Sequence, residues 1–108
     1  MSKTKIIWGA VNGNGSIKAG KGFRVSLVSD RTGFVDIIFE TPFAGLPVVT
    51  ATQNFRDWDG WNYFGGNAKD NAVLVAVDPT RCRILTGNSD GVPSRRNFTF
   101  TAIGPMFI

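Results

Sequence analysis

The sequence contains no histidine, and its 108 residues include a single cysteine, Cys82, and a single glutamate, Glu40. A chain of this kind lacks the usual pairings of a nucleophile with a base, so that paired carboxylates at Asp57 and Asp59 are the only conceivable catalytic group. One cysteine also excludes an internal disulfide and a cysteine-rich metal site. We therefore predict that the protein is not an enzyme, that it has no catalytic residue and that it needs no cofactor.

Long apolar runs are also missing. No stretch approaches the ~20 apolar residues that cross a bilayer. The start of the chain, Met1 to Val11, carries two lysines and an apolar run that is too short for a secretory signal. We expect no membrane insertion and no export signal. The expected location is the cytoplasm as synthesised, or the cell exterior or a virion reached by a non-classical route.

The formal net charge is +4 at pH 7, and the positive residues are unevenly spread. Lysines and an arginine precede the first acidic residue, and Arg81, Arg83, Arg95 and Arg96 surround Asp90 alone. This charge can attract phosphate, anionic glycans or an acidic partner, or it can simply solvate edges and loops. Nucleic acid is not an expected partner, because no recognition motif is present and the aromatic residues do not interleave with the basic ones.

Hydrophobic residues make up 43% of the chain and include nine phenylalanines, which is typical of a globular domain with one core. They alternate with polar residues at period two, the pattern of strands, and turn formers separate the alternating segments. The sequence predicts a single all-β domain over residues 1–108, an antiparallel β-sandwich of about six to seven short strands in which consecutive strands pair as hairpins. The predicted strands are Lys5–Val11, Phe23–Ser29, Phe34–Glu40, Pro47–Gln53, Ala72–Val77, Arg81–Thr86 and Asn97–Gly104.

The alternation also assigns the faces of these strands. Several outward positions keep large apolar residues, which is more than a solvated sheet needs, and subunit contact is one explanation. These outward residues are Val28, Phe34, Ile38 and Ile103. The predicted core face holds Phe23, Val25, Leu27, Val35, Ile37, Phe39, Phe98, Phe100 and Ala102, with Cys82 also pointing inward.

The one long irregular segment, Asn54–Asp70, holds two of the three tryptophans and the only tyrosine, together with arginine, aspartate and asparagine. Flat aromatic rings stack on the C–H face of a sugar, and nearby polar groups bind its hydroxyls. Alternatively, the aromatic residues fold back as a plug over the end of the sandwich or are buried in an oligomer contact. The candidate ligand-binding residues of this segment are Arg56, Asp57, Trp58, Asp59, Trp61, Asn62 and Tyr63.

The spacing Asp57-x-Asp59-Gly60-x-Asn62 is faintly similar to a calcium loop, because oxygen ligands around a glycine turn suit a hard cation. It lacks a third acid and the distal bidentate glutamate, so we predict no metal site. Arg81 and Arg83 complete the candidate ligand-binding set, since residues two apart on a strand share a face. Their guanidinium groups, and those of Arg95 and Arg96 after a Gly/Pro/Ser loop, can clamp a carboxylate, a phosphate or an acidic sugar. Interface salt bridges and plain exposure are the alternatives.

Four segments carry a resemblance to a known family. Pro42-Phe43 after a strand, Pro47-Val48-Val49 at the start of the next and the ending Ala102-Ile103-Gly104 resemble the framework of H-type lectin-like β-sandwich domains. Similar frameworks occur in small bacterial proteins and in trimeric tips of phage tail fibres. The matching segments are Gly22–Val25, Gly33–Phe43, Leu46–Thr52 and Phe98–Gly104.

The resemblance implies a β-sandwich that assembles as a homotrimer, or as a hexamer of two stacked trimers, with ligand sites near subunit edges. The lectin members recognise N-acetylgalactosamine and related sugars through polar side chains and an aromatic residue. This chain differs from them in having no histidine and in placing its aromatic loop before the fifth predicted strand. No sugar-contacting residue is therefore transferred by position.

The leading hypothesis is a non-enzymatic, carbohydrate-binding and homo-oligomeric module whose partners are a glycan or glycoconjugate and other copies of itself. In this hypothesis the aromatic loop and the neighbouring arginines form one recognition surface. The alternative is a structural or interaction protein, such as a tip subunit of a phage tail fibre or of a secretion apparatus. There the apolar outer faces and the aromatic loop make subunit contacts.

Overall fold

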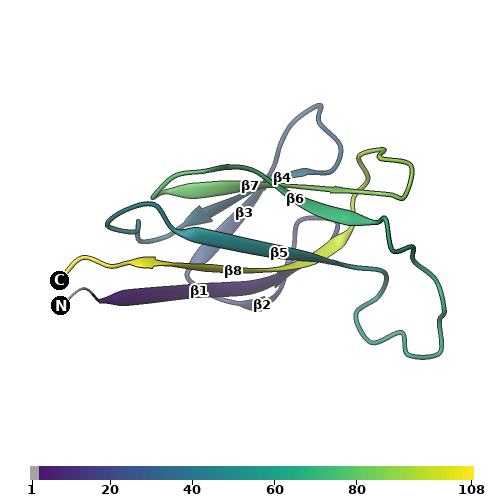
Figure 1. Cartoon of the computed structure of the whole chain (residues 1–108), viewed down its shortest axis with the longest axis horizontal. Helices are drawn as coiled ribbons and strands as arrows, with labels where there is room; N and C mark the ends of the chain where they lie inside the picture. The colour runs from purple at the N-terminus through teal and green to yellow at the C-terminus, as the bar shows by residue number, and fades with distance from the viewer. Residues whose placement is uncertain (1–2) are drawn as a thin grey trace.

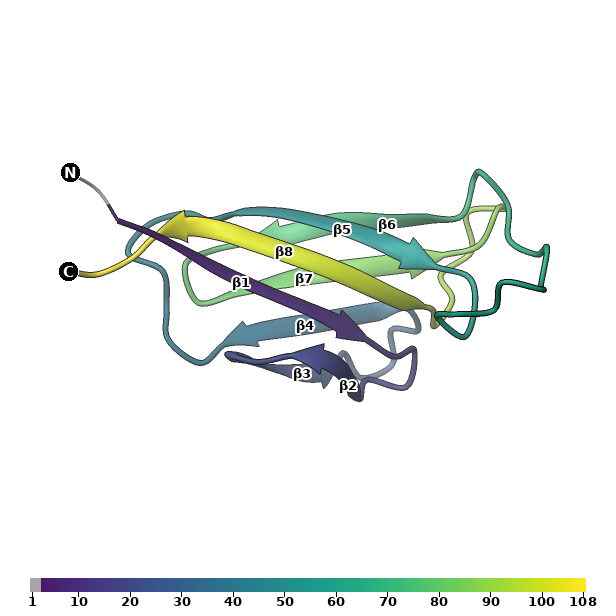
Figure 2. The same cartoon turned by 90° about the horizontal axis from the view of Figure 1, so that it is seen from below.

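The structure is a computed structural model that describes residues 3–108, and within this range it contains eight strands and no helix. The strands form two four-stranded antiparallel sheets, in the orders β2-β1-β8-β5 and β3-β4-β7-β6, which face each other (Figures 1 and 2). The predicted all-β antiparallel sandwich is confirmed. The strands are β1 Thr4–Val11, β2 Ile17–Gly20, β3 Phe23–Leu27, β4 Phe34–Phe39, β5 Val48–Asn54, β6 Asn71–Val77, β7 Arg81–Gly87 and β8 Asn97–Pro105.

One strand was not predicted. β2 has four residues, all at least partly exposed, and it pairs with β1 across an irregularity between Ala10 and Val11. A strand this short at a sheet edge carries no readable alternation, because neither of its faces is buried. Residues 3–108 form no helix that is long and apolar enough to cross a membrane.

The expectation that consecutive strands pair as hairpins is only partly correct. It holds for β1 with β2, β3 with β4, and β6 with β7. The other connections pass from one sheet to the other, and β8 pairs with both β1 and β5. Because these connections cross between the two sheets, each sheet covers the apolar face of the other. If all the strands followed one another within a single sheet, its apolar face would be exposed to water.

The core lies between the sheets and follows the predicted faces. Phe98, Phe100 and Ala102 of β8 are buried, as are Val35, Ile37 and Phe39 of β4. Val25 and Leu27 are partly buried and pack against this cluster. Phe23 and Phe100 meet edge to face with ring centroids 4.8 Å apart, and a Cβ added at Gly9 would collide with both rings. Glycine at this position therefore lets the two sheets join through aromatic side chains.

The two ends of the sandwich differ. At one end the C-terminal segment lies beside the start of β1, where the Met106 backbone N–H donates to the Lys3 carbonyl over 3.0 Å. At the opposite end the connection between β5 and β6, residues 55–70, projects beyond the sheets (Figures 1 and 2). The turn after β1 and the segment leading into β8 lie at this same end. We call residues 55–70 the aromatic loop and this end of the sandwich the loop end.

Candidate functional site at the loop end

The base of the aromatic loop is fixed by a polar network. The Gln53 side chain donates to backbone carbonyls of Asn71 and Gly87, at 2.6 and 2.9 Å. Arg96 donates to Gln53 Oε1 over 3.1 Å, lies 3.5 Å from a carboxylate oxygen of Asp70 and stacks on the Phe55 ring. These contacts connect both ends of the loop to β7 and to the segment that leads into β8.

Trp58 is anchored at both its backbone and its side chain. Its backbone N–H donates to Asn54 Oδ1 over 2.9 Å, and its indole Nε1–H donates to Asn12 Oδ1 over 2.8 Å. Asp57 and Trp58 have φ angles of 60° and 64°, the left-handed region that costs a non-glycine residue roughly 1 kcal/mol or more. The surrounding contacts therefore hold this ring in one position, and strain of this kind is common at binding sites.

A hollow of about 490 Å³ opens between the aromatic loop, the β1–β2 turn and the residues before β8. Asn97, one of its lining residues, accepts a hydrogen bond from the Gly13 backbone N–H over 2.9 Å. Arg95 is exposed, and among residues 3–108 its guanidinium has no ion pair or hydrogen bond. We call this space the Trp58 hollow; it is lined by Asn12, Gly13, Asn14, Asp57, Trp58, Arg95 and Asn97.

The Trp58 hollow offers both kinds of hydrogen-bonding group beside an aromatic ring. Asp57 supplies carboxylate acceptors, with one oxygen 3.3 Å from Arg56 Nε, and Arg95 supplies guanidinium donors. Asn14 Oδ1 already accepts from Ser16, and its amide N–H donors have no partner among the described residues. Asp57, with Arg56 beside it, and Arg95 thus place charges of both signs at the hollow.

The tip of the aromatic loop is exposed. Trp61 is 85% exposed and Phe64 96% exposed. Tyr63 is partly covered, because the Arg56 guanidinium lies 4.6 Å from its ring centroid and Phe55 lies on its other side. Trp58 is therefore the tryptophan of the loop that packs against the sandwich, whereas Trp61 faces solvent.

Two polar residues of the candidate set, Asp59 and Asn62, also lie at this exposed tip. Their side chains form no hydrogen bond or ion pair with residues 3–108. The described part of the chain contains no group of three or more side chains that could hold a metal ion.

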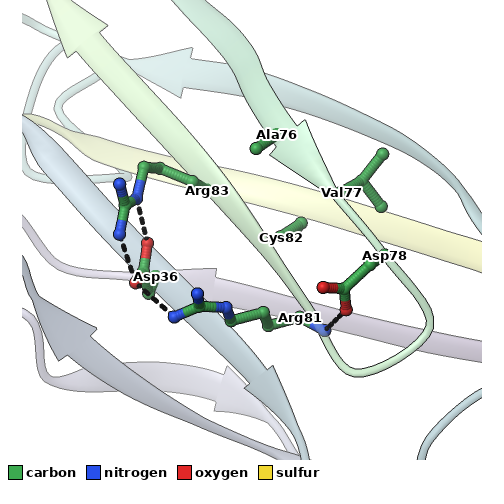
Figure 3. A pocket seen from close by; sticks show the side chains of 7 residues that line it. All are labelled: Asp36, Ala76, Val77, Asp78, Arg81, Cys82 and Arg83. Carbon is green, nitrogen blue, oxygen red and sulfur yellow. Dashed lines mark hydrogen bonds and ion pairs between the residues drawn. The ribbon is translucent and has the colours of Figure 1, made fainter.

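Arg81 and Arg83 lie elsewhere, on the outer face of the other sheet (Figure 3). Arg83 forms a two-point ion pair with Asp36, at 2.6 Å from Nε and 2.9 Å from Nη2, and Arg81 reaches the same carboxylate at 3.4 Å. The Asp36 hydrogen bonds raise the pKa of Arg83. The prediction that Arg81 and Arg83 share one face of the strand is confirmed. Both guanidinium groups, however, contact Asp36 of the neighbouring strand β4.

The expected joint surface of loop and arginines is not formed within the chain. β7 begins at Arg81 and reaches the loop end only at Gly87, which at ~3.3 Å per residue is roughly 20 Å away. The small cavity beside the arginine pair measures about 130 Å³ and is lined in part by Cys82 (Figure 3). Cys82 itself is 1% exposed, and burial raises the pKa of its thiol to about 12.

Sequence reasoning missed Asn12, Asn14 and Asn97 of the hollow, and it considered Arg95 only as a clamp for an anion and not as part of the predicted site. Their local signals are weak: an asparagine-glycine turn and a basic pair after a loop. Comparison of the chain with family models, with curated proteins and with solved structures found no match.

Proposed function

We propose that this protein binds carbohydrate in the Trp58 hollow, without catalysis. The observation that carries the proposal is a fixed, half-buried indole flanked by the unpaired donors of Arg95 and Asn14 and by the exposed carboxylate of Asp57. A sugar ring needs this combination, because its C–H face is apolar while each hydroxyl both donates and accepts.

The charge balance of the hollow favours a neutral sugar. Asp57 and Arg95 both line it, so that a phosphate or a carboxylate would meet a negative group as well as a positive one. The arginine pair at the other end offers no better anion site, since Arg83 is already occupied by Asp36. The proposed ligand is a terminal neutral sugar whose chain continues into solvent.

The exposed loop tip extends this site. Trp61 and Phe64 are the most exposed aromatic residues of the described chain and lie on the same loop as Trp58. Aromatic rings at this position add stacking surface for a second sugar unit. We therefore expect an oligosaccharide to bind more tightly than its terminal sugar alone.

A glycan array tests the proposal. Wild-type protein is expected to bind a subset of neutral glycans, and Arg95→Ala is expected to lose at least tenfold in signal. Arg95 makes no contact that holds the fold, so its loss reports on the ligand. Arg81→Ala is the matched control and should retain the wild-type signal.

Trp58→Ala should also abolish binding, and circular dichroism must show that the variant keeps its strands. Absence of signal on every glycan would contradict the proposal. Equal losses in Arg95→Ala and Arg81→Ala would contradict the location of the site.

A second candidate function is a structural tip subunit, in which the aromatic loop contacts another protein. It is favoured by one observation, the 85% and 96% exposure of Trp61 and Phe64 at the end of the sandwich opposite the start of β1 and the C-terminal segment. If this function holds, Trp61→Ala and Phe64→Ala lose an assembly partner while the array stays blank for all variants.

A further inference from the structure

The outer face of the sheet β2-β1-β8-β5 is unlike the rest of the surface. Strands β1, β5 and β8 contain one charged residue between them, Lys5. Its ammonium group turns toward the edge of the sandwich, where it donates to the carbonyls of Thr41 and Pro42 at 2.7 and 3.1 Å and lies over the Phe43 ring. The outward positions of β1, β5 and β8 therefore form a surface with no charge, which we call the charge-free face.

Apolar side chains are aligned across this face by the strand register. Ile6 of β1 and Val48 of β5 both lie opposite Ile103 of β8, so that the three form one row. Their exposed fractions are 57%, 72% and 42%. In the next row Trp8, 57% exposed, and Thr50 both lie opposite Thr101.

The outer face of the other sheet has a different composition. Arg24, Arg81 and Arg83 lie on it around Asp36, together with the outward apolar residues Phe34 and Ile38 of β4. Its charged residues distinguish it from the charge-free face, because a solvated sheet carries polar and charged side chains outward. The charge-free face instead has the composition of a surface that is removed from water.

We infer that the charge-free face is the contact surface between copies of this chain. The chain carries a net charge of +4, so two copies repel each other unless they meet where neither is charged. An acidic partner or an anionic membrane would instead be drawn to the basic outer face of the other sheet. The charge distribution thus selects a second copy as the occupant.

The size of the face approaches what this contact needs. Its three strands have 8, 7 and 9 residues, which at ~3.3 Å along a strand and ~4.8 Å between strands cover roughly 380 Å² of flat sheet. Two such faces bury roughly 760 Å² before side-chain relief is counted, about three quarters of the ~1,000 Å² expected of a specific protein interface. Apolar residues at the neighbouring end, Leu46 and Phe107, are 65% and 66% exposed and enlarge the surface.

Sedimentation velocity on the full chain tests the inference. Wild-type protein is expected to sediment as an oligomer at micromolar concentration. Thr101→Arg and Ile103→Lys place a charge at the centre of the face, and each is expected to weaken association on the order of a hundredfold. Both should sediment as monomers that retain the wild-type circular dichroism spectrum.

Two control variants locate the contact. Ser26→Arg adds the same charge to the exposed outer face of the other sheet, and Val75→Lys adds one to the apolar edge strand β6. Both should remain oligomeric. A monomeric wild type would overturn the inference, as would dissociation of Val75→Lys with Thr101→Arg still assembled.

The inference is independent of the proposed sugar site, and the two can fail separately. Monomeric Thr101→Arg should bind a free glycan as the wild type does and lose only the multivalent part of its array signal. A loss of free-glycan affinity in this variant would show that the hollow, and not the assembly, had changed.

Discussion

Asp36 shows how a side chain can occupy the outward face of a strand and still be buried. It is 6% exposed because Arg81 and Arg83 of the neighbouring strand close over its carboxylate. The alternation correctly predicted that the Asp36 side chain points away from the core. It did not predict that arginine side chains on the outer face would bury the carboxylate. The environment of Asp36 depends on which strand lies beside β4, and the sequence of β4 alone does not give this information.

Removal of the Asp36 carboxylate should destabilise the fold. Asp36→Ala leaves the half-buried Arg83 guanidinium without its two-point partner, and we expect a loss of about 1–2 kcal/mol in the free energy of unfolding, below that of a fully buried pair. Urea denaturation measures this loss. The double variant Asp36→Leu with Arg83→Leu should recover most of it. An unchanged midpoint in Asp36→Ala would contradict the account of this ion pair.

Cys82 should make the fold sensitive to alkaline pH. Burial raises the pKa of its thiol from 9.0 to about 12, so the folded protein keeps the thiol protonated while the unfolded chain ionises above pH 9.0. The stabilisation is fully present below pH 9.0 and is lost as the pH rises toward about 12, at about 1.4 kcal/mol per pH unit. Urea denaturation at neutral and alkaline pH measures the slope.

Cys82→Val is the control for this dependence, because it has a similar volume and no titratable group. It should show a flatter decline of stability above pH 9.0 than the wild type. The native thiol should also react slowly with alkylating reagents until the protein unfolds. Equal slopes in the two proteins, or rapid alkylation of the folded chain, would be evidence against the buried environment described for Cys82.

Strands were predictable wherever one of their faces is buried. β1, β4, β7 and β8 alternate because every second residue enters the core, and their boundaries were found to within about two residues. β2 was missed because it buries neither face. The crossing connections were also missed, since turn residues mark where a strand ends and not which sheet the chain enters next.

The aromatic loop depends on Arg96 for its shape. The guanidinium of this residue joins Phe55, Asp70 and Gln53, so Arg96→Met should loosen both ends of the loop. We expect chymotrypsin to cleave the folded variant several-fold faster after Trp61, Tyr63 or Phe64, because loose backbone is the substrate of limited proteolysis.

Arg95→Met is the matched control for this experiment, since it removes the neighbouring arginine, which has no partner among the described residues. Its cleavage rate should equal that of the wild type. If both variants were cleaved equally fast, the stacking and ion pair of Arg96 would not be what holds the loop.

The complete sandwich assembles a site that the sequence could not reveal. Trp58 was predicted as a ligand-binding residue, but Asn12, Arg95 and Asn97 come from segments far apart in the chain and meet only because β1 pairs with β8. Arg81 and Arg83 were placed with the loop in error, because the direction of β7 carries them to the far end. The aromatic composition of residues 55–70 was enough to identify the loop as a candidate site, whereas the residues beside it depend on the order of the strands in the sheets.

The proposed functions of the molecule occupy separate surfaces. The Trp58 hollow lies at the loop end, and the charge-free face lies on β1, β8 and β5. The start of β1 and the C-terminal segment lie at the opposite end of the sandwich (Figure 2). Copies that associate in parallel through this face would present their hollows side by side. Such an arrangement raises the avidity for a glycan surface without a new contact at each site.

The most direct test of carbohydrate binding at the loop end is a two-dimensional ¹H–¹⁵N NMR titration with the glycan that gives the strongest array signal. The three tryptophans give three indole N–H resonances, and these report on separate surfaces. We predict that the resonances of Trp58 and Trp61 shift on saturation, while those of Trp8 and of the Arg81–Arg83 backbone do not. Shifts at Trp8 or Arg83 with none at Trp58, or no shift with any glycan, would contradict the account.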